Sequence, residues 1–94
     1  MRVRWTRQAL QRLEEIGDHI ALDNPAAASR VVDTIRHKVE ALTAHPQLGR
    51  IGRVAGTREL VITGTPYLAA YRVRGQQIAI LAIFHGAQRW PASL

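Results

Sequence analysis

The chain has 94 residues, of which 47% are hydrophobic and 21% charged, so we expect one compact domain with an apolar core rather than a disordered chain. Its 13 lysines and arginines against 7 acidic residues give a net charge of +6, which indicates an anionic partner such as nucleic acid or an acidic protein segment. The absence of cysteine excludes a disulfide framework, a thiolate zinc site and a cysteine nucleophile.

The first half of the chain has the pattern of a helical hairpin. A first helix, capped by Thr6, carries apolar residues at spacings of three and four: Ala9, Leu13, Ile16 and Ile20. Asn24-Pro25 starts a second helix, because asparagine accepts hydrogen bonds from the first free amide groups and proline at the first helical position loses none. This helix should end before His45-Pro46, and its apolar stripe is Ala28, Val31, Ile35, Val39 and Leu42.

The second half changes to the two-residue period of β-strands. Turn-like segments at 63–66 and 74–75 separate three stretches rich in β-branched and aromatic residues: Thr57–Ile62, Tyr67–Val73 and Gln76–Phe84. We expect an antiparallel meander of three strands, with Val3–Trp5 as a further edge strand and therefore an α+β fold. The last strand is apolar on both faces, which indicates an internal strand with helices on one side.

The expected single domain, residues 1–94, divides into four parts. These are a helical hairpin at 6–44, an arginine- and glycine-containing loop at 45–56, the meander at 57–85 and a tail at 86–94. Strict alternation in the last strand places Ala82 and Phe84 on the face of Ile78 and Ile80. The longest apolar run, residues 78–84, is too short to span a membrane, and no secretory signal is present, so we expect a cytoplasmic protein.

Most of the positive charge lies in the second half. Residues 50–94 contain one acid, Glu59, and six arginines: Arg50, Arg53, Arg58, Arg72, Arg74 and Arg89. If the loop lies beside the last strand, several of these guanidinium groups and His85 converge on one sheet face, where they could hold phosphate oxygens. The simpler interpretation is surface charge with an ion pair such as Arg58 with Glu59.

Three further residues have two interpretations each. Arg72 lies within a strand, on the face of Leu68 and Ala70, where an unpaired charge is costly unless it faces a partner or a groove. His85 ends the most apolar strand and is either a general acid or base or a capping residue. Trp90 either closes the core or helps to receive a partner chain on an uncovered sheet face. The other histidines lack the spacing of a metal site, so we expect no metal and no cofactor.

With its elements in this order, the sequence resembles the RelE/ParE superfamily of toxins from bacterial type II toxin-antitoxin modules, including plasmid-stabilisation modules. The segments that carry the resemblance are Ile20–Ala28, His45–Arg50, Gly56–Ile62, Pro66–Val73 and Ile80–His85. The resemblance implies a growth-inhibiting toxin that a cognate antitoxin neutralises through an acidic and apolar segment. The residues expected to bind that segment are Leu68, Ala70 and Trp90.

Two activities occur within the superfamily. ParE-like members inhibit DNA gyrase by trapping its cleaved DNA complex, whereas RelE-like members cleave mRNA in the ribosomal A site. Ribonuclease members usually carry an arginine just after the position of Tyr67, where this chain has Leu68, and its only lysine is Lys38, so the lysine pairs of the RelE type are absent. The resemblance therefore favours a ParE-like gyrase inhibitor that is not itself catalytic.

Two alternatives remain beside this interpretation. A RelE-like mRNA endonuclease acting on the ribosome would use Arg58, Arg72 and His85 as candidate catalytic residues. A basic binding module would be neither toxic nor catalytic. In the favoured interpretation, the residues expected to contact the target or its anionic groups are Arg50, Arg53, Arg58, Arg72 and Arg89.

Overall fold

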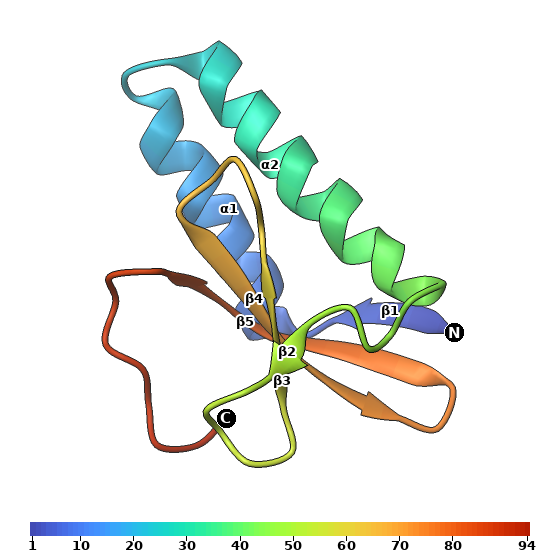
Figure 1. Ribbon diagram of the computed structural model, residues 1–94. Helices are drawn as coiled ribbons and strands as arrows, with labels where there is room; N and C mark the ends of the chain where they lie inside the picture. Colours follow the sequence, from blue (N-terminus) through green and yellow to red (C-terminus); the bar gives the residue numbers. More distant parts are fainter.

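A computed structural model describes residues 1–94 as a five-stranded sheet with two antiparallel helices packed on one face (Figure 1). The elements in chain order are β1 (Arg2–Trp5), α1 (Arg7–Ala21), α2 (Pro25–Glu40), a 3₁₀ turn (Ala41–Thr43), β2 (Arg50–Ile51), β3 (Arg58–Val61), β4 (Tyr67–Arg74) and β5 (Gln77–His85). The strand order is β1-β5-β4-β3-β2, with β1 parallel to β5 and the other pairs antiparallel. The predicted α+β fold is confirmed, and neither helix has the length and apolar character needed to cross a membrane.

Both predicted helix caps are present. The Thr6 hydroxyl accepts a hydrogen bond from the Ala9 amide at 3.2 Å and donates one to the Ile80 carbonyl at 2.7 Å, so the same side chain starts α1 and ties it to β5. The Asn24 side chain accepts from the Ala27 amide at 3.0 Å, and Pro25 occupies the first position of α2. These caps satisfy amide groups that would otherwise lack an intrahelical partner.

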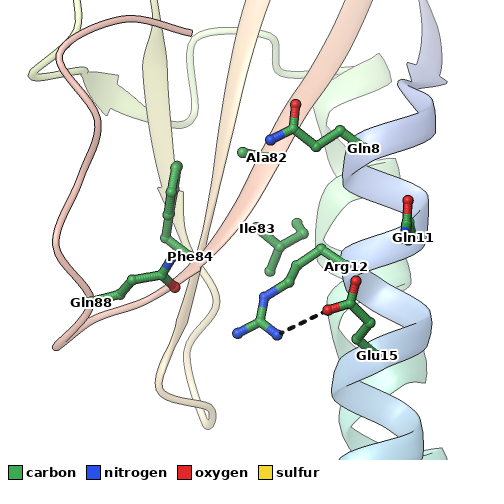
Figure 2. A pocket seen from close by; sticks show the side chains of 8 residues that line it. All are labelled: Gln8, Gln11, Arg12, Glu15, Ala82, Ile83, Phe84 and Gln88. Atoms are coloured by element: carbon green, nitrogen blue, oxygen red, sulfur yellow. Dashed lines mark ion pairs between the residues drawn. The ribbon is translucent and has the colours of Figure 1, made fainter.

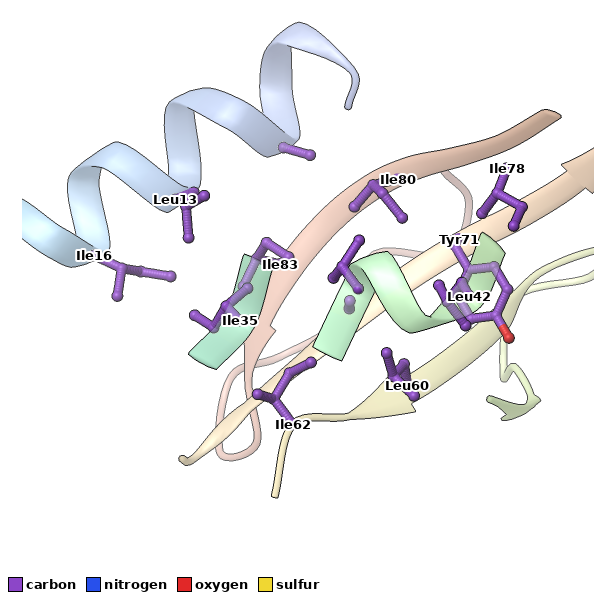
Figure 3. Packing of buried hydrophobic residues seen from close by; sticks show 13 residues of the cluster. Leu13, Ile16, Ile35, Leu42, Leu60, Ile62, Tyr71, Ile78, Ile80 and Ile83 are labelled. Atoms are coloured by element: carbon purple, nitrogen blue, oxygen red, sulfur yellow. The ribbon is translucent and has the colours of Figure 1, made fainter. Parts of the chain in front are cut away.

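The core lies between the helices and one face of the sheet (Figure 3). In Figure 3, Leu13 and Ile16 of α1 point toward the strands, and Ile83 lies beneath them. The buried members of this cluster are Ala9, Leu13, Ile16, Ile35, Val39, Leu42, Leu60, Ile62, Ala69, Tyr71, Ile78, Ile80 and Ile83. The residues of both predicted helical stripes contribute to this core or pack against it, apart from the buried Ala28 near the hairpin bend.

β5 is an internal strand, as predicted, but its alternation is not regular. The register with β4 shifts between Ala70 and Tyr71, where Tyr71 pairs with Ile80 and Ala70 pairs with Ala82. The extra residue, Leu81, reverses the facing of the residues after it, so Ile83 joins the helix-covered core. The prediction that Ala82 and Phe84 share the face of Ile80 is therefore wrong: both pack on the opposite face, which we term the open face.

Residues 45–56 are not entirely a loop. Arg50 and Ile51 form β2, which pairs with β3 through Arg50–Glu59 and Ile51–Arg58. The short strand follows a close approach of the chain to Tyr71, whose hydroxyl accepts from the Gly49 amide at 2.8 Å and donates to the Pro46 carbonyl at 2.8 Å. A side chain at Gly49 would meet the Tyr71 ring at 2.6 Å, so this approach requires glycine. The tyrosine thereby fixes where β2 begins.

Candidate functional site

Acidic residues are confined almost entirely to the helical layer. The hairpin at 6–44 holds five basic and six acidic residues, whereas the remainder of the chain holds eight arginines and one acid, Glu59. The molecule is therefore electrostatically polarised, with a nearly neutral helical layer and a strongly basic sheet. The sheet and its loops are where an anionic partner would bind.

Glu59 organises two of the predicted anion-binding arginines. Its side chain is only 2% exposed and accepts hydrogen bonds from the guanidinium groups of Arg50 and Arg53 and from the Arg53 amide, at 2.8–3.3 Å. Burial alone would raise the pKa of Glu59, but these hydrogen bonds outweigh it and lower the pKa from 4.5 to about 2. The predicted ion pair of Glu59 with Arg58 is wrong, because Arg58 instead donates to the Gly49 carbonyl at 2.7 Å.

The tail covers part of the open face. Trp90 stacks on Phe84 with ring centroids 4.1 Å apart, and the guanidinium of Arg53 lies 3.9 Å from the Trp90 ring centroid. Leu94 packs against the same cluster, whose buried members are Ala70, Ala82 and Phe84. The Trp90 indole N–H is buried without a hydrogen-bond partner. Two of the residues predicted to bind an antitoxin, Ala70 and Trp90, therefore already pack together within the chain.

His85 sits at the end of β5 in a turn that uses its side chain. Its Nδ1 accepts a hydrogen bond from the Ala87 amide at 3.1 Å, and its ring meets Tyr67 edge to face with centroids 5.6 Å apart. Its own amide donates to the Gln88 side-chain oxygen at 3.2 Å. These contacts correspond to the capping interpretation of His85, in which the imidazole stabilises the turn that leads into the tail.

The expected convergence on one sheet face is wrong for His85 and Arg58, whereas Arg50 and Arg53 do lie on the open face around Glu59, the register partner of Ala70. His85 pairs with Tyr67 and Arg58 pairs with Tyr71, and both tyrosines belong to the helix-covered side of β4. Arg72, between Tyr71 and Val73, points to the open face. His85 and Arg58 are also separated by about four residues of strand, or roughly 13 Å. The β5 bulge and the strand pleat thus distribute these side chains over both faces.

Arg72 instead lies beside two arginines outside the predicted anion-binding set. Together with Arg4 and Arg74 it lines a shallow groove of about 200 Å³ on the open face, over Ala79 and Leu81. None of these arginines forms an ion pair. Arg89, the remaining predicted anion-binding residue, is exposed in the tail and likewise unpaired.

The signal for Arg4 was present in the sequence. In Arg2-Val3-Arg4-Trp5, arginines alternate with apolar residues, so both arginines of an edge strand occupy one face. What the pattern could not reveal is the neighbouring strand, because β1 pairs with β5 across more than 70 residues of sequence.

A second groove, of about 310 Å³, runs between α1 and the second half of β5 (Figure 2). β1 pairs only with Gln77–Ile80, so the rest of β5 has no strand neighbour on this side. Figure 2 shows Gln8 and Arg12 of α1 facing Ala82 and Ile83, with the Arg12–Glu15 ion pair at 3.9 Å along the rim. The other lining residues are Gln11, Phe84 and Gln88. No group of three or more histidine or acidic side chains is arranged to hold a metal ion.

Comparison with known proteins places the chain in a family. A family model described as the ParE toxin of the type II toxin-antitoxin system parDE matches residues 3–90. Y4kP of Sinorhizobium fredii, a protein named as a toxin, is 47% identical over 93 residues, covering 99% of this chain and 96% of the relative. Toxin RelE2 of Caulobacter vibrioides is 34% identical over 84 residues, covering 89% and 93%.

Comparison with solved structures supports the same family. A solved structure described as the chromosomal ParDE TA system from P. aeruginosa superposes with a TM-score of 0.81 and 36% sequence identity, over 90% of this chain and 95% of that one. The superfamily resemblance seen in the sequence is thereby confirmed. This chain belongs to the ParE family of toxins of type II toxin-antitoxin systems.

Proposed function

We propose that this toxin acts by inhibiting DNA gyrase and that a cognate antitoxin neutralises it. The observation that carries the choice of target is the separation of the candidate nuclease residues. Arg58 and His85 lie on the helix-covered side of the sheet near different ends of β4, whereas Arg72 lies on the open face. RNA cleavage by attack of a 2′-hydroxyl requires groups that surround one phosphate, and these three side chains do not.

Membership of the ParE family supports the same target. At the position where ribonuclease members usually carry an arginine, Leu68 is an apolar residue only 8% exposed. The similarity to Toxin RelE2 is the observation that favours the alternative, a ribosome-dependent mRNA endonuclease. The gyrase proposal places the protein in the cytoplasm, where its target works.

The antitoxin proposal is supported by the basic sheet and by the apolar cluster beneath the tail. Leu68 and Ala70 pair with Phe84 and Ala82 across β4 and β5, and Trp90 packs against Ala70, Ala82 and Phe84 of this apolar surface. An antitoxin segment with acidic and apolar residues would replace Trp90 on this surface and supply an acceptor for its unpartnered indole N–H. Its carboxylates would pair with Arg89, which is exposed and has no ion-pair partner beside Trp90 in the tail.

The target is tested by adding the purified chain to gyrase with relaxed plasmid, and in parallel to ribosomes programmed with mRNA. We expect supercoiling to stop, cleaved plasmid to accumulate, and A-site mRNA to stay intact. An antitoxin encoded by the adjacent gene should restore supercoiling when added. Cleavage of A-site mRNA that disappears in His85→Ala or Arg72→Ala would refute the gyrase proposal. Unimpaired growth during expression without antitoxin would refute toxicity itself and leave a plain binding module.

The predicted target-contacting residues can be separated with the same assay. Arg72 and Arg89 have no protein carboxylate as partner, so Arg72→Gln and Arg89→Gln should weaken gyrase inhibition without loss of thermal stability. Arg50 and Arg53 neutralise Glu59, so Arg50→Gln should lower the melting temperature as well. Arg58 is expected to contact the target through the part of its guanidinium that Gly49 leaves free.

A further inference from the structure

Ala79 of β5 lies between two arginines on the open face. Its register partners are Arg4 of β1 and Arg72 of β4. Adjacent strands lie about 4.8 Å apart, so the two arginine Cα atoms are about 10 Å from each other across the small Ala79 side chain. The groove on the open face is lined by both of these arginines, which places their side chains around a common hollow.

The arrangement repeats two residues along the strand. Arg2 of β1 and Arg74 of β4 are both register partners of Gln77. Residues two apart on a strand are separated by about 6.7 Å, so the second pair of arginines follows the first at that distance. We refer to these four residues as the arginine frame: Arg2, Arg4, Arg72 and Arg74.

The arginine frame has no counter-charge within the chain. The ion pairs of the molecule join Arg12 to Glu15 and Arg50 and Arg53 to Glu59, and none includes a frame residue. Every other acid lies in the helical hairpin, on the opposite side of the sheet. The Cα atoms of these four arginines span roughly 7 by 10 Å, so their positive charges repel one another, and a bound anion would offset that repulsion.

We infer that the arginine frame binds two successive phosphate groups of one nucleic-acid strand. Arg4 and Arg72 bind one phosphate from opposite sides above Ala79, and Arg2 and Arg74 bind the next. Arg72 does so with its terminal N–H groups, because its Nε donates to the Gly56 carbonyl at 3.4 Å. The guanidinium fork suits this role, because it donates two parallel hydrogen bonds to phosphate oxygens.

The floor of the frame also favours nucleic acid over an acidic peptide. Between the arginines the groove is small, about 200 Å³ over Gln77, Ala79 and Leu81, whereas the aromatic part of the open face, which would anchor a bound peptide, lies under Trp90 instead. The frame is at the opposite end of β4 from His85, and of the three candidate nuclease residues it includes only Arg72. A gyrase inhibitor could act through protein contacts alone, so direct contact with DNA goes beyond the proposed function.

The test is fluorescence anisotropy of a labelled oligothymidylate titrated with the purified full-length chain, without gyrase. Two neutralised phosphates on a single strand predict that log K falls with log salt at a slope of about −1.4. The double variant Arg2→Gln/Arg4→Gln should bind at least tenfold more weakly and with a shallower slope. The matched control Arg30→Gln/Arg36→Gln removes the same charge from exposed positions of α2 and should change the dissociation constant less than twofold.

Equal weakening of the two double variants would overturn the inference, because it would mean diffuse attraction by net charge. An oligoglutamate peptide of equal charge serves as competitor. If the oligonucleotide binds weakly and this peptide displaces it, the inference is overturned in favour of an acidic peptide. Circular dichroism establishes that each variant is folded. Arg74→Lys keeps the charge but loses the two parallel donors of the guanidinium, so it tests the site without disturbing β1. Since no gyrase is present, failure here is distinguishable from failure of the proposed target.

Discussion

The buried carboxylate of Glu59 gives the sharpest quantitative prediction. In Glu59→Gln the side chain keeps its shape but loses the charge that Arg50 and Arg53 surround, and its amide NH₂ now faces their donors. A fall in the pKa from 4.5 to about 2 corresponds to about 3 kcal/mol of stabilisation at neutral pH. Because both guanidinium groups are about half exposed, we expect a measured loss of about 2 kcal/mol.

The pH dependence distinguishes this mechanism from a simple packing defect. The pKa of Glu59 is lower in the folded chain than in the unfolded one, so its stabilisation is complete above about pH 4.5 and is lost as the pH falls toward 2. Thermal unfolding should therefore show a melting temperature lowered by roughly 10 °C at pH 7 in Glu59→Gln, and a smaller difference at about pH 2.5. Glu14→Gln, at an exposed and unpaired acid of α1, is the control. An equal deficit at both pH values would refute the charge argument.

Three further variants test other contacts. Tyr71→Phe leaves the buried Gly49 amide without an acceptor and should lower the free energy of unfolding in denaturant by about 1–3 kcal/mol. Because burial raises the pKa of Tyr71, the wild type should also lose stability above about pH 10, and this loss should be absent in the variant. Thr6→Ala should cost about 1–2 kcal/mol, since it removes the cap of α1 and the bond to Ile80; a loss below about 0.5 kcal/mol would show that water replaces both. Trp90→Ala should lower the free energy of unfolding by less than the roughly 3–5 kcal/mol typical of a buried tryptophan, because its indole N–H already lacks a partner. A larger loss in a denaturant titration would contradict this expectation.

The sequence was sufficient for the elements whose signals are local. Thr6 and Asn24 are caps because of hydrogen bonds within four residues, and the helical stripes follow from spacings of three and four. The meander follows from composition and turns. Membership of the toxin family was likewise readable, because it rests on short segments in a fixed order.

The errors arose where distant contacts decide the outcome. Alternation could not show the bulge at Leu81, which exchanges the faces of Ala82 and Ile83. Residues 50–51 lack a strand signal of their own, and they pair because Glu59 and Tyr71 hold that segment against β3. The candidate site shifted for the same reason, since the grouping of arginines depends on which strands are neighbours rather than on which residues are close in sequence.

The parallel pairing of β1 with β5 affects when the protein can acquire its structure during synthesis. Arg2 pairs with Gln77, and Thr6 donates to Ile80, so the first strand has no partner until some 75 further residues have been made. Until then Val3 and Trp5 remain exposed, and closing so long a loop is slow compared with forming the helical hairpin. An incomplete chain therefore lacks the arginine frame altogether, and a ribosome that stalls before residue 77 releases a product without that surface.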